Sequence, residues 1–476
     1  MIFNSPQFLV FLAVVFALYW APLTGDGRHR IPVLLLASYV FYGWWDVRFL
    51  ALILFSSLFN QRMAIAIADA HAERTKDRLI LAVLVVDLGL LFFFKYFNFF
   101  LDSLQVALGM DGVPWTLAIA LPVGISFFTF QTLGYCLDVY NEDQEPMRDL
   151  PVFFTFVSFF PLLLAGPIER GNDLLPQLAS PRTYRREQLV EGLRLLLIGA
   201  FKKMVIADRF APLADTVFDQ PSLFGGLIGG LGVIFFAVEI YADFSAYSDI
   251  ARGASKLLGI DLTRNFDRPY FSFSLAEFWT RWHITLNTWF RDYLYTPLAY
   301  GMRNRGLLGV MVAITITFLL SGLWHGPTWN FVLWGLWLGL FMAVELAVGV
   351  RMTRWPKPLR WLLTMGVILS SMILFKAKTL GKAWEFAGNI FTFGHDPVFL
   401  IRRILSYTEQ TPFSFAMTLL FGIMLFVIDH RSARPDFIPR MERRPMLRYA
   451  GYAGLLLALL FFGVFVDQKA FIYFQF

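Results

Sequence analysis

The sequence predicts an all-α protein that crosses a membrane many times. Hydrophobic residues make up 57% of the chain and charged residues only 16%, whereas a soluble domain is about one half apolar and one quarter charged. The apolar residues form helix-length runs and do not alternate with polar ones, which excludes a transmembrane β-barrel. Because one span needs ~20 residues, a chain of 476 residues has room for roughly a dozen spans.

The apolar runs define the candidate spans in order. The second and third are short and are separated by Gly43-Trp44-Trp45-Asp46, so we expect them to form a hairpin. The sixth is also short and is framed by Pro151 and by Ala165-Gly166-Pro167, which predicts a re-entrant segment; such backbone is tolerated at membrane depth only within protein or beside a cavity. The candidate spans are 6–21, 31–44, 48–60, 79–97, 115–136, 150–165, 192–212, 222–247, 306–322, 328–349, 360–379, 411–428 and 447–466.

Loops rich in Lys and Arg predict the orientation, because such residues are enriched on the cytoplasmic side. If the sixth run does not cross, both chain ends lie outside and residues 252–300 lie on the cytoplasmic side. The net charge of +6 comes from these loops and does not indicate nucleic-acid binding. Without a repeat or a linker, residues 1–476 are expected to form one domain with a motif core at about 121–345. The basic loops are residues 28–30, 71–78, 182–186, 303–305, 351–360 and 430–448.

Residues 276–295 contain the first polar cluster. Their aromatic residues recur at three- and four-residue steps, which predicts one amphipathic helix. One interpretation is an interfacial helix with tryptophans at the headgroup level. His283, however, lies within the aromatic face, and a half-buried imidazole that titrates near neutrality suits proton transfer. That face consists of Trp279, Trp282, His283, Leu286, Trp289, Phe290 and Tyr293, opposite Arg281, Thr285, Thr288 and Asp292.

The second polar cluster is Trp324-His325-Gly326-Pro327, where one span ends and the next begins. Glycine allows close approach of other groups and proline breaks a helix. We therefore expect His325 at a helix end, at the outer turn or within the bilayer. An ionisable side chain at that depth is usually functional. The alternative is a capping or core histidine that is paired with a carbonyl group.

Other kinds of active site are not indicated. The two histidines are far apart in sequence and the single cysteine, Cys136, is best explained as a small buried residue, so we expect no metal site. A G-x-S-x-G elbow, a P-loop and a dinucleotide fingerprint are all missing from the sequence. Asp243 and Asp249 are the acidic candidates. They could orient a histidine, and the alternative is a structural pairing with Arg281 or Arg291.

Taken together, these motifs resemble those of the membrane-bound O-acyltransferase (MBOAT) family, in the branch of the bacterial alginate O-acetyltransferases. The specific pair is Arg281-Trp282-His283 through Tyr295 with Gly322-Leu323-Trp324-His325-Gly326. The weaker matches, in family order, are Leu121-Pro122-Val123-Gly124-Ile125-Ser126-Phe127, Ala165-Gly166-Pro167-Ile168 and Asp243-Phe244-Ser245-Ala246-Tyr247-Ser248-Asp249. The resemblance implies a ring of roughly 11–13 transmembrane helices, with re-entrant and interfacial helices, around a central tunnel.

The resemblance also implies roles for single residues. His325 matches the family's near-invariant active-site histidine, and His283 matches the second motif position. His325 would take the proton from an acceptor hydroxyl as its oxygen attacks a thioester carbonyl, while His283 positions the donor or steadies the developing charge. Leu338 stands where close relatives carry a third histidine, which leaves the acceptor open. The residues expected to bind the donor are Trp282, Asn287, Arg291, Asp292, Trp324 and Asp243.

The implied function is that of an O-acetyltransferase of the bacterial inner membrane. It would pass an acetyl group from a cytoplasmic thioester, acetyl-CoA, to an extracytoplasmic polysaccharide (alginate-like, another exopolysaccharide or a cell-wall glycan) or to a partner. The expected partner is a periplasmic or membrane-anchored acetyltransferase with an esterase-like fold, and we expect no bound cofactor. The alternatives are a transporter or flippase without transferase chemistry, and a scaffold that recruits a soluble transferase. Transporters often contain internal repeats, and this sequence shows none.

Overall fold

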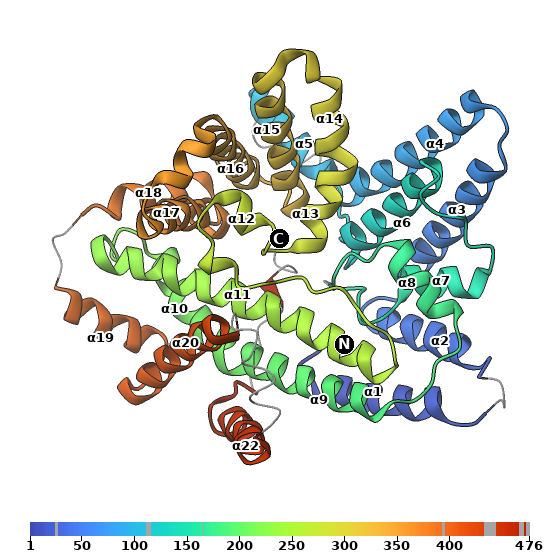
Figure 1. Cartoon of the computed structure of the whole chain (residues 1–476). Helices are drawn as coiled ribbons and strands as arrows, with labels where there is room; N and C mark the ends of the chain where they lie inside the picture. The colour runs from blue at the N-terminus through green and yellow to red at the C-terminus, as the bar shows by residue number, and fades with distance from the viewer. Residues whose placement is uncertain are drawn as a thin grey trace. The chain divides into compact units, whose positions relative to one another are not determined.

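The computed structural model describes residues 1–23, 27–110, 116–164, 166–392, 396–432, 444–465 and 471–472, which form helices and no strand. The predicted all-α fold is therefore confirmed (Figure 1). Residue 115 of the fifth candidate span, Ala165, residues 433–443 of the last basic loop and residue 466 of the last candidate span lie outside the described residues. The chain divides into two compact units, Met1–Leu196 with Ser248–Arg264 and Leu197–Tyr247 with Asn265–Phe476.

The first unit consists of the N-terminal helices. α3 and α4 both pack against α6, and α2 packs against α7. The Asp87 carboxylate on α4 accepts hydrogen bonds from Asn60 Nδ2 on α3 (3.1 Å) and Thr132 Oγ1 on α6 (3.4 Å), so a small polar cluster joins these helices. The elements are α1 (Pro6–Trp20), α2 (Arg30–Gly43), α3 (Phe49–Asp69), α4 (Glu73–Leu91), η1 (Phe92–Tyr96), α5 (Phe97–Ala107), α6 (Ile125–Tyr140), α7 (Leu150–Ser158), α8 (Gly171–Ala179) and the start of α9 (Arg186–Phe201).

The second unit contains both polar clusters that the sequence singled out. Its core is rich in aromatic side chains; the rings of Phe218 and Phe386, for example, stack with their centroids 4.4 Å apart. The elements are η2 (Lys202–Ala207), α10 (Asp208–Asp219), α11 (Gly226–Leu257, as far as Tyr247), η3 (Pro269–Phe271), α12 (Leu275–Trp279), α13 (Ile284–Phe290), η4 (Arg291–Tyr295), α14 (Thr296–Gly301), η5 (Arg303–Arg305), α15 (Gly306–His325), α16 (Trp329–Val348), η6 (Gly349–Arg354), α17 (Lys357–Lys376), α18 (Leu380–Asn389), α19 (Pro397–Tyr407), α20 (Pro412–Ser432) and α22 (Pro445–Phe462).

The protein is a multi-pass membrane protein. Among the described residues, 8 helical stretches are long and apolar enough to cross a membrane. α1 and α2 are also apolar but have only 15 and 14 residues, about 21–22 Å against a hydrocarbon thickness of about 30 Å. The spanning stretches are Phe49–Asp69, Glu73–Ala107, Gly226–Leu257, Arg303–His325, Trp329–Val348, Lys357–Lys376, Pro412–Ser432 and Pro445–Phe462.

Several candidate spans have other bounds than the apolar runs predicted. The third, expected to be short, is a helix of 21 residues, because α3 continues to Asp69. In the fifth, the helix begins only at Ile125, because Gly124 has φ 75° and stops the helix from extending toward Pro122. In the sixth, α7 has 9 residues and a length of about 13.5 Å, too short to cross; that the segment re-enters the membrane stays a prediction. The seventh lies within a longer helical stretch, residues 186–219.

α15 and α16 form a tightly packed antiparallel pair in which glycines allow the backbones to touch (Figure 1). A Cβ atom at Gly322 would lie 2.2 Å from the Phe331 carbonyl oxygen, and one at Gly335 would lie 2.3 Å from the Phe318 carbonyl oxygen. Small residues favour close helix packing in membranes, where lipid is as apolar as the side chains. α17 also packs against α16.

Candidate active site

Residues 276–295, which the sequence predicts to be one amphipathic helix, form separate short helices with a break at His283. α12 ends at Trp279, α13 begins at Ile284, and His283 has φ 44°, a conformation that few residues other than glycine adopt. The prediction of a continuous helix is wrong because a long-range contact interrupts it: the Asn265 carbonyl oxygen accepts a hydrogen bond from Ile284 N (3.0 Å). The aromatic face still predicts burial correctly for Trp282, Leu286, Trp289 and Phe290.

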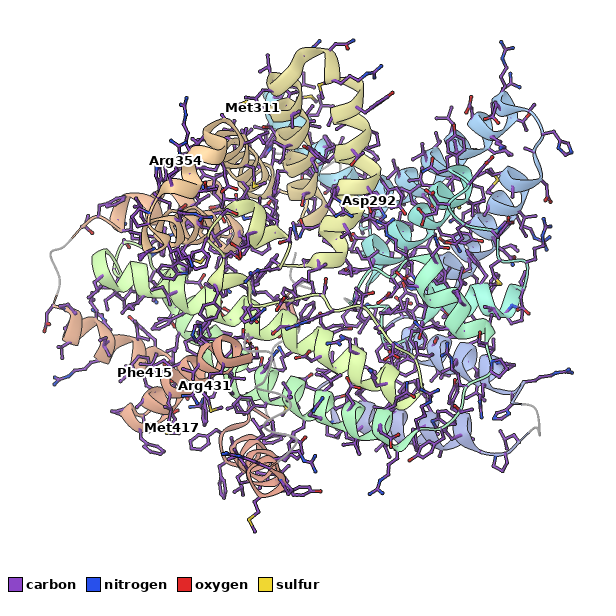
Figure 2. The ribbon with its side chains drawn as sticks, in the orientation of Figure 1. Asp292, Met311, Arg354, Phe415, Met417 and Arg431 are labelled. Atoms are coloured by element: carbon purple, nitrogen blue, oxygen red, sulfur yellow. The ribbon has the colours of Figure 1, made fainter. Side chains whose placement is uncertain are left out.

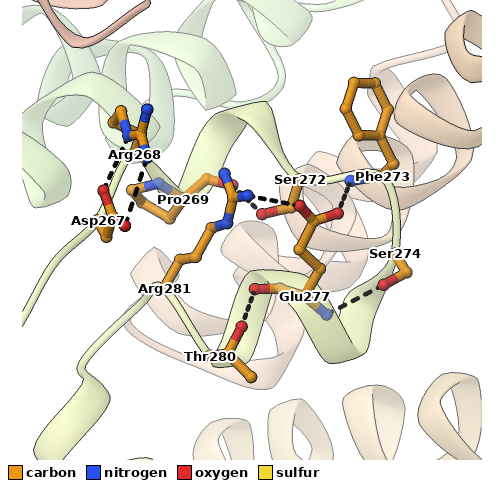
Figure 3. Close-up of polar contacts among 9 residues, drawn as sticks. All are labelled: Asp267, Arg268, Pro269, Ser272, Phe273, Ser274, Glu277, Thr280 and Arg281. Carbon is orange, nitrogen blue, oxygen red and sulfur yellow. Dashed lines mark hydrogen bonds and ion pairs between the residues drawn. The ribbon is translucent and has the colours of Figure 1, made fainter. Parts of the chain in front are cut away.

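Glu277 holds the segment before the break in place (Figure 3). Ser274 Oγ accepts a hydrogen bond from Glu277 N (3.0 Å), while the Glu277 carboxylate accepts one from Phe273 N (2.7 Å), an arrangement close to a capping box. The same carboxylate lies 2.6 Å from Arg281 Nη2. The Arg281 carbonyl oxygen accepts a hydrogen bond from Asp267 N (2.9 Å). One acidic side chain thus connects the start of α12 to the turn that leads to His283.

A second carboxylate, that of Glu345 on α16, also holds the start of α12. It accepts hydrogen bonds from Leu275 N (2.6 Å) and Ala276 N (3.0 Å), the first amides of the helix. These amides have no partner within a helix and would otherwise need water. Because α12 is held in this way, Trp279 at its end lies against the Trp334 ring of α16, with the centroids 6.1 Å apart.

His283 is fully enclosed, with 1% of its surface exposed. Its Nδ1 lies 3.2 Å from Asn265 Oδ1, which also accepts hydrogen bonds from Thr285 N and Thr285 Oγ1, both at 3.1 Å. Because the Thr285 amide can only donate, the oxygen of the Asn265 side chain must face this turn, and His283 Nδ1 therefore carries the proton. Nε2 is then the basic nitrogen of the ring.

Burial also decides the charge of His283, which lies outside the spanning helices. Desolvation lowers the pKa of His283 to about 3, because an imidazolium ion loses its hydration in this environment. The ring is therefore neutral at physiological pH. It packs edge-on against Phe244, with the centroids 4.7 Å apart, and lies 6.0 Å from the ring of Trp324. Because the ring is neutral and can accept a hydrogen bond, it is better suited to orienting the acyl donor than to attracting an anion.

His325 is the last residue of α15, as predicted, and 6% of its surface is exposed. Its ring lies edge-to-face against Trp334, with the centroids 5.0 Å apart, and against Phe375 at 5.5 Å. The next residue must be glycine, since a Cβ atom at Gly326 would lie 2.3 Å from the Phe331 ring. The helix end and the aromatic neighbours together fix the imidazole inside the second unit.

A cavity of about 20 Å³ lies beside His325, large enough for a water molecule. Its walls are mainly aromatic and aliphatic, so a charge that develops there would be weakly screened. An imidazole beside such a cavity can accept a proton from a hydroxyl group. The routes by which a donor and an acceptor reach it stay predictions. The lining residues are Ile240, Phe278, Trp279, Trp282, His325, Trp334, Ile368, Ser371, Met372 and Phe375.

The acidic candidates have partners other than those considered from the sequence. Asp243 is buried, lies 2.8 Å from Lys203 Nζ and accepts a hydrogen bond from Ile472 N (2.8 Å). The suggested pairing of Asp243 with Arg281 or Arg291 is therefore not observed, because Lys203 of η2 pairs with Asp243 instead. Asp249 lies 3.9 Å from Arg252 Nη1, one helical turn away.

The remaining predicted residues differ in how close they lie to the histidines. Trp282 lines the cavity, and Trp324 packs against the rings of both histidines. Asn287 Nδ2 donates to the Trp282 carbonyl oxygen (2.5 Å) and thereby stabilises the turn at His283. Arg291 and Asp292 are exposed in η4 and pair with each other, Nε to Oδ1, at 2.8 Å. Figure 2 shows where Asp292 lies.

Several residues of the site were not found from the sequence. Asn265 comes 18 positions before its partner His283 and carries no local signal. Trp334 belongs to the segment Trp334-Gly335-Leu336-Trp337-Leu338-Gly339, which drew notice only for Leu338; that leucine is fully buried one turn beyond Trp334. Among the described residues, no three His, Cys, Asp or Glu side chains are grouped as metal ligands would be.

Comparisons with known proteins show which proteins this chain resembles. Residues 143–380 match the model of the membrane-bound O-acyltransferase family. The chain is 40% identical over 400 residues to the "Probable alginate O-acetylase AlgI" of Pseudomonas aeruginosa, covering 83% of this chain and 75% of the relative. It is 34% identical over 423 residues to the "Peptidoglycan O-acetyltransferase" of Helicobacter pylori (80% and 78%). It is 27% identical over 284 residues to the "Teichoic acid D-alanyltransferase" of Streptococcus thermophilus (53% and 68%).

Proposed function

Because the chain belongs to the membrane-bound O-acyltransferase family, we propose that it is an O-acetyltransferase that takes its acetyl group from a thioester on the cytoplasmic side. The acceptor is a polysaccharide outside the membrane, or a partner acetyltransferase that completes the transfer there. The donor is acetyl-CoA, the membrane is the bacterial inner membrane, and no resident cofactor takes part. Membership of this family favours O-acyl transfer over the alternatives of a transporter, a flippase or a scaffold.

The observation that carries the proposal is the position of His325 beside a small, largely apolar cavity. The imidazole accepts the proton of the acceptor hydroxyl while the hydroxyl oxygen attacks the thioester carbonyl carbon. It then returns that proton to the leaving sulfur, which departs as a free thiol. General base catalysis of this kind contributes typically 10²–10⁴-fold to the rate. The low polarity of the cavity also limits hydrolysis by excluding bulk water.

His283 has a supporting role in this proposal. Asn265 fixes its tautomer and presents the basic Nε2 side of a neutral ring. We assign to it the positioning of the donor or of Trp324, whose ring lies between the two histidines. Arg291 and Asp292, which are exposed, would contact the polar part of the donor before it enters.

The choice of acetyl and of a polymer acceptor is supported by the relatives. The first two are named for acetyl transfer to alginate and to peptidoglycan, and the third for D-alanyl transfer to teichoic acid. Each name pairs a small acyl group with a polymer. The stronger identity is to the acetyl-transferring relatives, 40% and 34% against 27%.

A sided assay tests the proposal. The protein is reconstituted into vesicles with acetyl-[¹⁴C]-CoA outside and either mannuronate oligosaccharides or soluble peptidoglycan fragments inside. We expect release of free CoA and label on one of the trapped polymers, with each signal lost in His325→Ala. His71→Ala, which alters an exposed histidine, serves as the matched control and should behave as wild type. CoA release equal to that of protein-free vesicles would contradict the proposal.

A further inference from the structure

Two tryptophans beside His325 have indole N–H groups that the protein itself does not satisfy. Trp279 and Trp334 both line the cavity. Their Nε1 atoms are buried, and neither has a hydrogen-bond acceptor among the described residues. The ring of Trp334 is 4% exposed, so bulk water does not supply the acceptor. Buried donors without a partner are rare in native structures, and each needs an explanation.

The third indole at the cavity, that of Trp282, is not left as a buried donor without an acceptor. The hydroxyl group of Ser371 is used within its own helix, where it donates to the Ile368 carbonyl oxygen (2.7 Å). Apart from His325, Ser371 and the tryptophans, the remaining lining residues are aliphatic, aromatic or methionine side chains. Indole Nε1 is a donor only. The cavity therefore matches a small group that carries a hydrogen-bond acceptor.

The geometry brings these donors close to the base. The Trp334 ring is edge-to-face with His325 at a centroid separation of 5.0 Å, and edge-to-face with Trp279 at 6.1 Å. Two carboxylates hold the helix that carries Trp279, since Glu345 accepts hydrogen bonds from its first amides and Glu277 connects its start to the following turn. Preorganised donors of this kind stabilise charge in a transition state more than freely moving ones.

We propose that the indole N–H groups of Trp334 and Trp279 bind the carbonyl oxygen of the thioester and stabilise the oxyanion formed on it. This inference rests on the proposed function. As the acceptor oxygen bonds to the carbonyl carbon, His325 takes its proton and the carbonyl electron pair moves to the oxygen held by the indoles. When the C–S bond breaks, that pair reforms the carbonyl group and the sulfur takes the proton from His325. The products are an ester and a thiol.

An isosteric replacement tests the role of the N–H group itself. In Trp334→3-benzothienylalanine, sulfur replaces the N–H while the bicyclic ring is kept, so the fold should be preserved. We expect kcat with acetyl-CoA to fall on the order of 10²–10³-fold, with KM changed less than threefold. The control is the same replacement at Trp337, on the same helix but 37% exposed and outside the cavity lining; it should leave kcat unchanged.

An infrared measurement separates this role from a structural one. In the slow His325→Gln background, the C=O stretch of bound [1-¹³C]acetyl-CoA should rise in frequency when Trp334 loses its N–H. An unchanged stretch, with or without a fall in kcat, would overturn the proposal and leave water as the partner of the indoles. If wild-type turnover equals that of His325→Ala, the proposed function fails. The infrared shift then tests separately whether the indole of Trp334 binds the thioester carbonyl oxygen. If the protein binds no thioester, both the proposed function and the proposed role of the indoles are excluded.

Discussion

At the scale of single residues, the site depends on one asparagine that accepts three hydrogen bonds. Asn265 Oδ1 lies 3.1–3.2 Å from His283 Nδ1 and from the amide and hydroxyl groups of Thr285. These contacts keep His283 in a left-handed conformation and fix which nitrogen carries the proton. The neutral state follows from burial, which lowers the pKa of His283 to about 3. Asn265 thus sets the conformation and tautomer of the second histidine, whereas burial sets its charge.

Removal of the Asn265 side chain should therefore lower both stability and activity. In Asn265→Ala the three donors of His283 and Thr285 lose their partner in a buried place, which costs about 1–3 kcal/mol. We expect a lower melting temperature in detergent and slower acetyl-CoA turnover. Asn304→Ala, at an exposed position, should change stability by less than about 0.5 kcal/mol. Equal melting temperatures for the two variants would show that the Asn265 contacts do not hold the turn.

The depressed pKa of His283 predicts how stability depends on pH. The folded pKa of about 3 lies below the unfolded value of about 6.5, so the unfolded state binds more protons between these values. The contribution of neutral His283 to the free energy of unfolding is therefore complete above about pH 6.5. It is lost as the pH falls, at up to about 1.4 kcal/mol per pH unit. Asparagine tolerates positive φ, so His283→Asn should keep the turn. In this variant the pH-dependent part of the stability that comes from His283 disappears. Melting curves of the two proteins that run parallel from pH 7 to pH 4.5 would refute this explanation.

At the scale of elements, the antiparallel pair of α15 and α16 places the base. Contact between their backbones depends on Gly322, Gly335 and Gly339, at each of which a Cβ atom would lie less than 3 Å from a backbone atom of the neighbouring helix. Such packing leaves no freedom to shift one helix along the other. Because His325 ends α15 and Trp334 belongs to α16, the distance between the base and the cavity wall follows from this contact.

A pair of glycine variants tests the importance of this packing. Gly335→Ala introduces a Cβ atom 2.3 Å from the Phe318 carbonyl oxygen, and overpacking of this kind costs about 1–3 kcal/mol. We expect lower stability and a loss of turnover, since His325 and Trp334 must move apart. In Gly366→Ala, on α17, the new Cβ atom meets nothing within 4 Å, so a small gain in stability of about 0.5–1 kcal/mol is expected. Similar effects in both variants would contradict the packing argument.

At the scale of the whole molecule, the sequence predicted the kind of elements better than their interruptions. Helix-length apolar runs identify spans because burial in lipid depends on local composition, and α15, α16 and α17 lie close to where the runs placed them. The helix end at His325 was predictable from Gly326-Pro327 for the same local reason. The break at His283 was not, since it depends on Asn265, which is distant in sequence. The hydrogen bonds between the Glu345 carboxylate and the first amides of α12 could not be predicted for the same reason.

The predicted orientation in the membrane can be tested on a favourable background, because the single cysteine, Cys136, is buried. The basic loop at 303–305 should face the cytoplasm and the segment that contains α18 and α19 should face outward. In intact cells, a membrane-impermeant maleimide should label Ser406→Cys and should label Asn304→Cys only after permeabilisation. Both positions are exposed. The reverse pattern would place the donor side outside and would exclude a cytoplasmic thioester as the substrate.

The most direct test of the account is the rate of acetyl transfer in His325→Ala, measured as CoA release under saturating acetyl-CoA alongside wild type and His71→Ala. If His325 is the base, kcat should fall by about 10²–10⁴-fold, while His71→Ala keeps the wild-type rate and all three proteins melt at similar temperatures. A His325→Ala protein that is folded and retains more than about one third of the wild-type kcat would contradict the central claim.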